Sequence, residues 1–448
     1  MTAIVARLPA LRDSPSLHRR LPGLAAALDV DAMRPRLRAM LDPTHAFVDG
    51  TPHTVRYRGA DGCDVRFTVR SRHGSTGAVR ETTVLGRVLP GPDRIVGYQA
   101  RVDPLVPAAA HLLGPFAAAT FTHPDLALVL SVFPVDPALP TLAAAADPAR
   151  LRYELPAVFA RSDCAVEVVR HARDGRCVLR YALPDTAPLY GKVHADATGA
   201  ALWRLLARLG PALAGVGVPR PLGYSAAIRT FVCARVPGRP AVLTGPGEAR
   251  RLVAAAAAAA SALHAAPVGT PARRAFAGEA TALRADLELL RAPWPEIAEL
   301  LGAELTALEE RAGDTPAGPP VLVHGDLTPS QLLLEQGSSH LVDFDAAAMA
   351  EPAFDLGRFR GYLRLALLKA GHPPMAPAFP DAFADAYIDA ARPGRRAAAA
   401  LPARMAVFER LSLLRVATNA CLKLKTDRLL TALTLLGILP PPRRGVPS

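Results

Sequence analysis

Two acidic residues that each follow a short apolar run are the residues of this chain best placed to do chemistry. Asp326 follows Val321-Leu-Val323, and Asp343 follows Leu341-Val342 some 17 positions later. The amide of Gln331 stands five residues after Asp326. Two short strands that each end in an acid would gather two carboxylates and an amide, the oxygen ligands that Mg²⁺ takes when it also holds phosphates. Phosphoryl transfer needs little more than such a metal, a base beside the acceptor hydroxyl, and positioning.

The same residues resemble a family motif. His324-Gly-Asp326, Gln331 and Asp343 are similar to the motif of the aminoglycoside phosphotransferase and choline kinase group of protein-kinase-like small-molecule kinases, and the likeness continues through Asp345 to Glu351-Pro-Ala-Phe-Asp355. The family usually has Asn where this chain has Gln331, and Gln there resembles the maltokinase and glucosamine-kinase branch. The resemblance implies an α+β, protein-kinase-like bilobal fold, with a β-rich N-lobe and a helical C-lobe. It also implies phosphate transfer to a hydroxyl group of a small molecule.

Roles follow from the resemblance. Asp326 would orient the acceptor hydroxyl and accept its proton. Asp343, with Gln331 as second ligand, would bind Mg²⁺ on the phosphates of ATP (or GTP). Lys192 would hold the α- and β-phosphates, and residues 233–236 would line the adenine. The alternatives without a catalytic role are that Asp326 caps a turn and that Asp343 ends a strand at the surface. Lys192 would then be an ordinary edge-strand lysine.

Two further residues are expected to support the catalytic loop. His324 is interpreted as a structural residue that fixes the loop by hydrogen bonding, rather than as a proton carrier. Asp355 is expected to cap its helix and to brace the loop.

Residues 151–240 are expected to form the kinase-like N-lobe. Strands are predicted at 165–170, 177–183 and 189–194, a helix at 199–209, and a hairpin from 218–224 and 230–236. Lys192 lies in the third strand. The family pairs this lysine with a Glu on the next helix, but residues 197–209 contain no Glu and Asp196 is the nearest acid. A nucleotide-binding pseudokinase without turnover therefore stays open, as does a maltokinase-like sugar kinase.

An internal repeat precedes this lobe. Val55–Phe67 aligns without gaps on Val169–Tyr181, and Leu85-Gly-Arg87-Val resembles Tyr190-Gly-Lys192-Val. Residues 45–150 are therefore predicted to be an N-terminal cap, a possible degenerate duplicate of the N-lobe. The guanidinium of arginine does not lose its charge and is wider than the ammonium group of lysine. Arg87 would therefore not be equivalent to Lys192 at a phosphate site. The alternative is chance similarity in a biased composition.

The remaining regions complete the domain prediction: a helical leader at 1–44, a helical C-lobe with the catalytic and metal loops at 241–439, and a disordered tail at 440–448. Helices are expected at 355–370, 380–391 and 403–439, the last with a break. Five acids could offer negative charge to an amine-bearing or polyhydroxy acceptor: Asp345, Glu351, Asp381, Asp385 and Asp389. Asp381, Asp385 and Asp389, however, have the spacing of one solvated helix face.

Composition narrows the function class. Of 448 residues half are apolar, and 52 Lys and Arg against 40 Asp and Glu give a formal net charge of +12. The basic residues are scattered without runs, which argues against nucleic-acid binding, but they could attract the nucleotide or an anionic substrate. No signal peptide is recognised, and the apolar stretch at 252–263 is too short to span a bilayer. Five cysteines at no metal-site spacing suggest a cytoplasmic protein with buried thiols. Oligomeric state and acceptor identity stay open.

Overall fold

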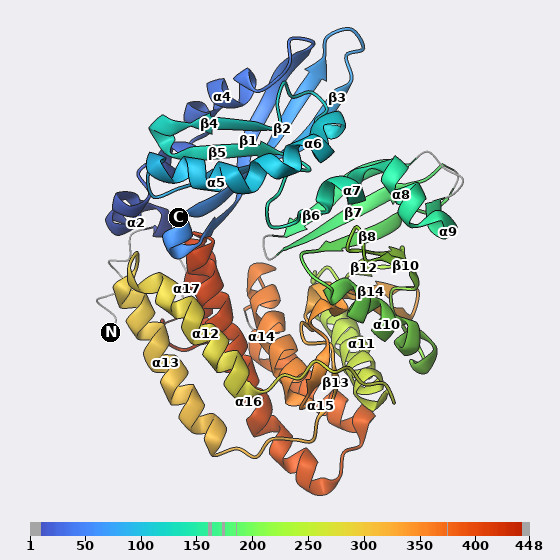
Figure 1. Ribbon diagram of the computed structural model, residues 1–448. Coiled ribbons are helices and arrows are strands. Elements are labelled where there is room, and N and C mark those ends of the chain that lie inside the picture. The colour runs from blue at the N-terminus through green and yellow to red at the C-terminus, as the bar shows by residue number, and fades with distance from the viewer. Residues whose placement is uncertain (1–9, 160–163, 173–174, 185, 374, 441–448) are drawn as a thin grey trace.

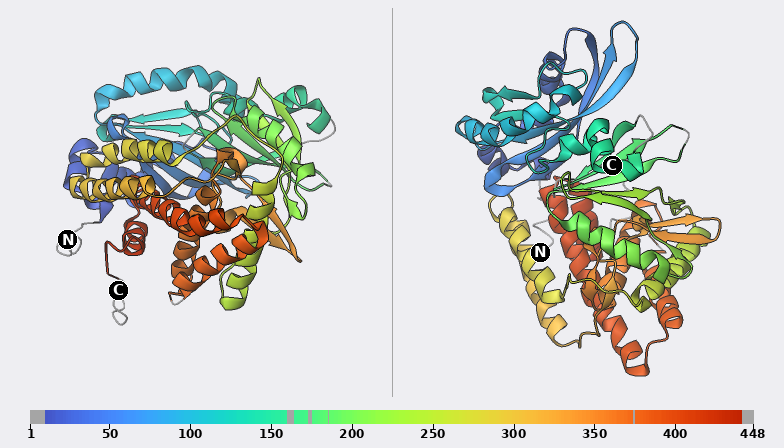
Figure 2. Two further views of the ribbon diagram at one scale, coloured as in Figure 1. Left: turned by 90° about the horizontal axis from the view of Figure 1, so that it is seen from below. Right: turned by 45° about the vertical axis from the view of Figure 1, so that its right-hand side comes forward.

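The computed structural model describes residues 10–159, 164–172, 175–184, 186–373 and 375–440. Two β-sheets lie next to each other above a helical lobe, with the N-terminal sheet in blue and the second in green (Figures 1 and 2). The first nine residues of the predicted leader and residues 441–448 of the predicted tail lie outside the described residues. In the part described, no helix is both long enough and apolar enough to cross a membrane.

The N-terminal sheet is antiparallel throughout and has the strand order β1-β2-β3-β5-β4. Its strands are β1 (His45–Tyr57), β2 (Cys63–His73), β3 (Val79–Val88), β4 (Thr120–His123) and β5 (Leu128–Val132). All five residues of β5 are buried. Leu128, Leu130 and Val132 pack with the leader helices, while Val129 packs with Ile95 on the opposite face. Cover on both faces explains why four of the five residues of this strand are apolar, with Ser131 as the exception.

Short helices cover this sheet. The leader contains η1 (Leu11–Asp13), α2 (Pro15–Arg20), α3 (Leu24–Leu28) and α4 (Val30–Ala39). Between β3 and β4 lie η3 (Pro92–Arg94), α5 (Ile95–Val102), η4 (Asp103–Leu105), α6 (Val106–Ala109) and η5 (Ala110–Leu112). The leader also ties the sheet to the helical lobe, since the indole Nε1 of Trp294 donates to the carbonyl of Leu11 at 3.2 Å.

The second sheet has the same order of strands, β6-β7-β8-β11-β10, again antiparallel. Its strands are β6 (Ala165–Ala172), β7 (Arg176–Ala182), β8 (Leu189–His194), β10 (Pro221–Ser225) and β11 (Thr230–Ala234). Helix α10 (Thr198–Ala212) follows β8. Three helices that follow the first sheet share the second sheet's buried core, so the link between the sheets is itself packed. They are α7 (Leu142–Ala146), α8 (Pro148–Glu154) and α9 (Pro156–Phe159).

Strand registers also agree between the sheets. Cys63 pairs with Val88 in the first sheet, and Cys177 pairs with Val193 in the second. Between β3 and β5 Arg87 pairs with Val129, and between β8 and β11 Lys192 pairs with Phe231. At these positions the residues that correspond in the sequence repeat are paired in the same way in both sheets.

The helical lobe begins with α11 (Pro246–Ala265). It also carries two small sheets that position the loop with Asp326. Its other helices are α12 (Phe276–Arg291), α13 (Pro295–Gly313), α14 (Ala353–Lys369), α15 (Met375–Ala391), α16 (Arg395–Leu422) and α17 (Thr426–Leu435). The small sheets have the orders β12-β14-β15-β9 and β13-β16. Their strands are β9 (Val216–Gly217), β12 (Arg239–Pro240), β13 (Val321–Val323), β14 (Leu332–Glu335), β15 (Ser338–Leu341) and β16 (Ala348–Ala350). The α+β bilobal, protein-kinase-like fold expected from the sequence is confirmed, and the predicted helix break lies between α16 and α17.

Candidate active site

The catalytic loop leaves β13 at His324 and is held from below by Asp355 on α14. The fully buried Asp355 carboxylate accepts hydrogen bonds from the backbone N–H groups of His324 at 2.6 Å and Gly325 at 2.8 Å. Burial alone would raise the pKa of Asp355, but hydrogen bonding and charge from His264 outweigh it and lower that pKa. Asp355 thus braces the loop, as expected, but it does not cap its own helix, whose N-cap is Pro352 without a side-chain cap.

Gly325 and His324 give the loop its shape. Gly325 has φ +78°, and a Cβ there would lie 1.9 Å from the carbonyl oxygen of Ala346, so only glycine fits. His324 Nε2 donates to the carbonyl of Val342 at 2.9 Å, and its Nδ1 accepts from the N–H of Asp326 at 3.3 Å. These contacts select the neutral imidazole with its proton on Nε2. His324 therefore joins the loops that carry Asp326 and Asp343.

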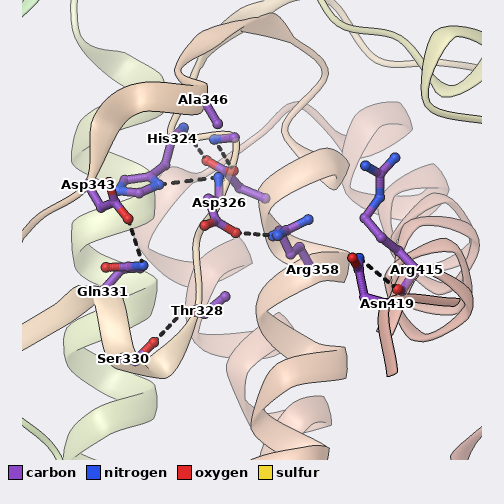
Figure 3. Close-up of polar contacts among 12 residues, drawn as sticks. His324, Asp326, Thr328, Ser330, Gln331, Asp343, Ala346, Arg358, Arg415 and Asn419 are labelled. Carbon is purple, nitrogen blue, oxygen red and sulfur yellow. Dashed lines mark hydrogen bonds and ion pairs between the residues drawn. The ribbon is translucent and has the colours of Figure 1, made fainter. Parts of the chain in front are cut away.

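Asp343 meets the lysine of the second sheet. Lys192 Nζ lies 2.7 Å from Asp343 Oδ1, and the amide Nε2 of Gln331 lies 3.3 Å from Asp343 Oδ2 (Figure 3 shows the Gln331 contact). Asp343 has φ +71°, a left-handed conformation that aspartate tolerates better than most residues. Three sequence-predicted residues from separate segments thus converge at one point between the lobes.

The donor set at this point fits Mg²⁺. The ion commonly takes one or two protein oxygens, keeps several waters and completes its shell with phosphates. The Asp343 carboxylate and the carbonyl oxygen of the Gln331 amide can supply those two oxygens. Among the described residues no group of three or more His, Cys, Asp or Glu could hold a metal by itself.

Asp345 occupies a place that the sequence did not assign to it. It forms an ion pair with Lys192, its Oδ1 lies 2.8 Å from His194 Nε2, and only 4% of its side chain is exposed. Burial opposes its ionisation, but the hydrogen bond from His194 and the charge of Lys192 hold its pKa well below the usual range. Asp345 was expected on the acceptor side, and this was wrong: it takes the place of the missing helix Glu as the partner of Lys192. Asp196 instead accepts from the N–H of Thr198 at 2.9 Å.

The candidate base has a partner that sequence reasoning missed. Arg358 forms an ion pair with Asp326, and the side chain of Arg358 is 14% exposed (Figure 3). Burial would lower the pKa of Arg358, but the charge of Asp326 outweighs it and raises that pKa. Arg358 stands one helical turn after Asp355 on α14, so residues three apart on one face reach the loop backbone and the loop acid. That spacing was the signal available in the sequence.

The other acids proposed for the acceptor side lie elsewhere. Glu351 is buried in a two-pronged pair with Arg404, at 2.7 Å for each contact. Asp381 pairs with Arg360 at 2.8 Å. Asp385 and Asp389 are exposed on α15. The solvated-face interpretation therefore fits Asp385 and Asp389, while Glu351 and Asp381 each pair with an arginine.

The comparisons with known proteins give one family match. The model of the phosphotransferase enzyme family, APH, matches residues 166–401. No curated protein matches the chain. Solved structures of similar shape include choline kinase from Cryptosporidium parvum Iowa II (13% identity, 65% of this chain and 97% of that one, TM-score 0.46). Another is macrolide 2'-phosphotransferase MphH from Brachybacterium faecium (21% identity, 66% and 100%, TM-score 0.42).

Proposed function

Because the chain belongs to the phosphotransferase enzyme family, we propose that it transfers the γ-phosphoryl group of ATP or GTP to a hydroxyl group of a small molecule. The observation that carries the proposal is the 2.7 Å contact of Lys192 with Asp343, next to Gln331 and to the loop that presents Asp326. A phosphate-binding cation, two oxygen ligands and a carboxylate base are the parts that phosphoryl transfer requires.

Each side chain has a defined task in this proposal. Lys192 is a point charge for the phosphates, and Asp345 and His194 fix its position from the buried side. Asp343 and Gln331 would hold Mg²⁺, which when bound neutralises the charge of the phosphate oxygens. Asp326 accepts the proton of the acceptor hydroxyl, a contribution of about 10²- to 10⁴-fold in rate for a positioned base. Residues 235–238 join β11 to β12, and the adenine is expected beside residues 233–236.

The test is ADP release from Mg·ATP by the wild type and by Asp343→Asn, against pooled sugars, aminoglycosides, amino alcohols, hydroxy acids and nucleosides. Acceptor-dependent release that Asp343→Asn abolishes is the expected result. Binding of Mg·ATP without release in any pool would contradict the proposal and favour a pseudokinase. The absent helix Glu, the Gln in place of Asn and the duplicated lobe favoured a pseudokinase, and the pairing of Lys192 with Asp345 weakens the first of these arguments. A sugar-dependent signal alone would favour the maltokinase-like alternative.

We also propose that residues 45–150 are a degenerate copy of the kinase lobe, on the basis of the shared strand order and register. Arg87, which stands where the second lobe has Lys192, is used within its own lobe: its Nε lies 2.7 Å from Asp64, and its guanidinium lies 5.2 Å from the centre of the Tyr98 ring. One nucleotide per chain is therefore expected in titration calorimetry, and two would contradict this reading.

A cytoplasmic location is part of the proposal. All five cysteines are buried with free thiols, as is usual for proteins of a reducing compartment.

A further inference from the structure

The acceptor side of the catalytic loop is basic. Four arginines gather there from four elements: Arg56 on β1, Arg274 before α12, Arg358 on α14 and Arg415 on α16. Figure 3 shows Arg358 between Asp326 on one side and Arg415 with Asn419 on the other. The cluster is therefore adjacent to the carboxylate that would receive the acceptor hydroxyl.

The contacts connect these arginines into one group. Arg415 Nη2 and Arg274 Nη2 each lie 2.7 Å from a different oxygen of Glu279. Arg274 Nη1 also donates to the carbonyl of Gly325 in the catalytic loop at 3.3 Å. Arg358 and Arg415 line the same small cavity, together with Glu279. One carboxylate thus serves two guanidinium groups beside the loop.

The N-terminal lobe reaches the same place. Arg56 Nη1 donates to the side-chain oxygen of Asn419 at 3.4 Å, and the Asn419 amide donates to the carbonyl of Arg415 at 3.0 Å. Within the described ranges Arg56 makes no ion pair with a carboxylate. The lobe that bears no nucleotide lysine therefore contributes a cation to the acceptor side.

Among the residues that the structure describes, the four guanidinium groups share only two direct carboxylate partners, Asp326 and Glu279. Asp286 adds a weaker attraction to Arg415, and Asp355 adds one to Arg358. Burial lowers the pKa of Arg415; the charge of Glu279 opposes this shift, and the nearby charges of Arg358 and Arg274 add to it. Arg358 Nε is buried and has no hydrogen-bond partner among the residues described. An anion placed here would relieve like-charge repulsion and satisfy an unused donor.

We propose that the acceptor is an anionic hydroxy compound, whose carboxylate or phosphate group is bound by Arg358 and Arg415, with Arg56 contributing from the N-terminal lobe. This inference rests on the proposed function and specifies its substrate class. Guanidinium groups bind both anions through paired N–H donors, so the shared chemistry is recognition of a planar or tetrahedral oxyanion. With the anionic group on Arg358, the acceptor hydroxyl lies on the side of Asp326. The acidic acceptor site expected from the sequence would have selected the opposite charge.

The experiment compares matched acceptors at saturating Mg·ATP: glycerol, D-glycerate, glycerol 3-phosphate and ethanolamine. An anionic member is expected to have a KM at least tenfold below that of glycerol, and the carboxylate and phosphate compounds identify which anion is preferred. Arg415→Gln should raise the KM of that acceptor by about 10- to 100-fold, the value of a lost charged hydrogen bond, with the KM of Mg·ATP unchanged. Arg56→Gln should raise it less. Phosphorylation of ethanolamine or glycerol with a KM insensitive to Arg415→Gln would overturn the inference.

Arg410→Gln is the matched control. Arg410 lies on the same helix, is similarly exposed at 26% against 21%, and pairs with Glu304 rather than with the cluster. The control should leave both KM values unchanged.

A binding measurement separates failure of the inference from failure of the proposed function. With the nucleotide site filled by a non-hydrolysable Mg·ATP analogue, inorganic phosphate should bind the wild type in titration calorimetry and should bind Arg415→Gln at least tenfold more weakly. Phosphate binding without turnover of any acceptor would overturn the kinase function alone. Turnover without phosphate binding would overturn the anionic acceptor alone.

Discussion

The contact of Lys192 with Asp345 allows a quantitative test of how the two lobes hold the nucleotide lysine. Both side chains are largely buried, at 17% and 4% exposure, and removal of one partner from a buried ion pair costs about 3–5 kcal/mol. Asp345→Asn keeps the hydrogen bond from His194 and leaves Lys192 its contact with Asp343. We therefore expect the lower end, a loss of about 3 kcal/mol in the free energy of unfolding.

A double-mutant cycle isolates the pair itself. With Lys192→Met as the second change, the coupling energy between residues 192 and 345 should be about 2 kcal/mol in urea unfolding. The same cycle with Asp343→Asn serves as control, because Asp343 is 26% exposed and its coupling should be about 1 kcal/mol or less. Additive effects for the Asp345 pair, or a larger coupling for Asp343, would refute the assignment of Asp345 as the main anchor of Lys192.

The coupling energy between Lys192 and Asp345 should be constant at intermediate pH and should fall at both extremes. The pKa of Asp345 is lowered on folding, so its contribution is full above the unfolded value of about 4 and is lost as pH falls below that. The pKa of Lys192 is raised, because the charges of Asp345 and Asp343 outweigh its burial. Its contribution is full below the unfolded value of about 10.4 and is lost as pH rises through the folded value. The coupling is therefore expected to be flat from about pH 5 to pH 9; a slope inside that window in repeated cycles would contradict it.

Three further substitutions test the loop. Asp326→Asn should keep Mg·ATP binding in calorimetry and lower phosphoryl transfer by about 10²-fold or more; full transfer would remove Asp326 from the role of base. Asp343→Asn should weaken nucleotide binding only when Mg²⁺ is present, and an unchanged dependence on Mg²⁺ would count against it as a ligand. Asp355→Ala should lower the free energy of unfolding by about 3 kcal/mol or more, because two buried backbone N–H groups lose their acceptor. A variant as stable as the wild type in urea would show that Asp355 does not brace the loop.

Local patterns in the sequence were enough to predict the fold, and they also selected the residues that meet at the candidate site. The apolar run before Asp326, the strand that carries Lys192 and the periodic leucines of α10 each reflect a physical requirement within a few residues of chain. The repeat predicted a first lobe because equal spacing of apolar positions gives equal registers.

Partners from distant segments could not be predicted in the same way. Asp345 and Lys192 are 153 residues apart, and Arg56 and Asn419 are 363 apart. Nothing in a linear pattern shows which acid faces which lobe, and Asp345 was therefore grouped with the acids that follow it in the chain. Asp343 and Asp345 both reach Lys192, while Phe344 between them packs against His324 with a ring separation of 4.6 Å.

The buried core has a consequence for any attempt to shorten this protein. One continuous apolar cluster joins the leader, the N-terminal sheet and the helical lobe, from Leu11 to Leu436. The family match ends at residue 401, which leaves seven of the 28 residues of α16 inside it. A fragment cut to the family boundaries would lose the rest of that helix and expose the faces of α12 and α14 that it covers. The segment that the family model matches is thus smaller than the segment that shares the continuous core, and a fragment cut at the boundaries of the match is expected not to fold on its own.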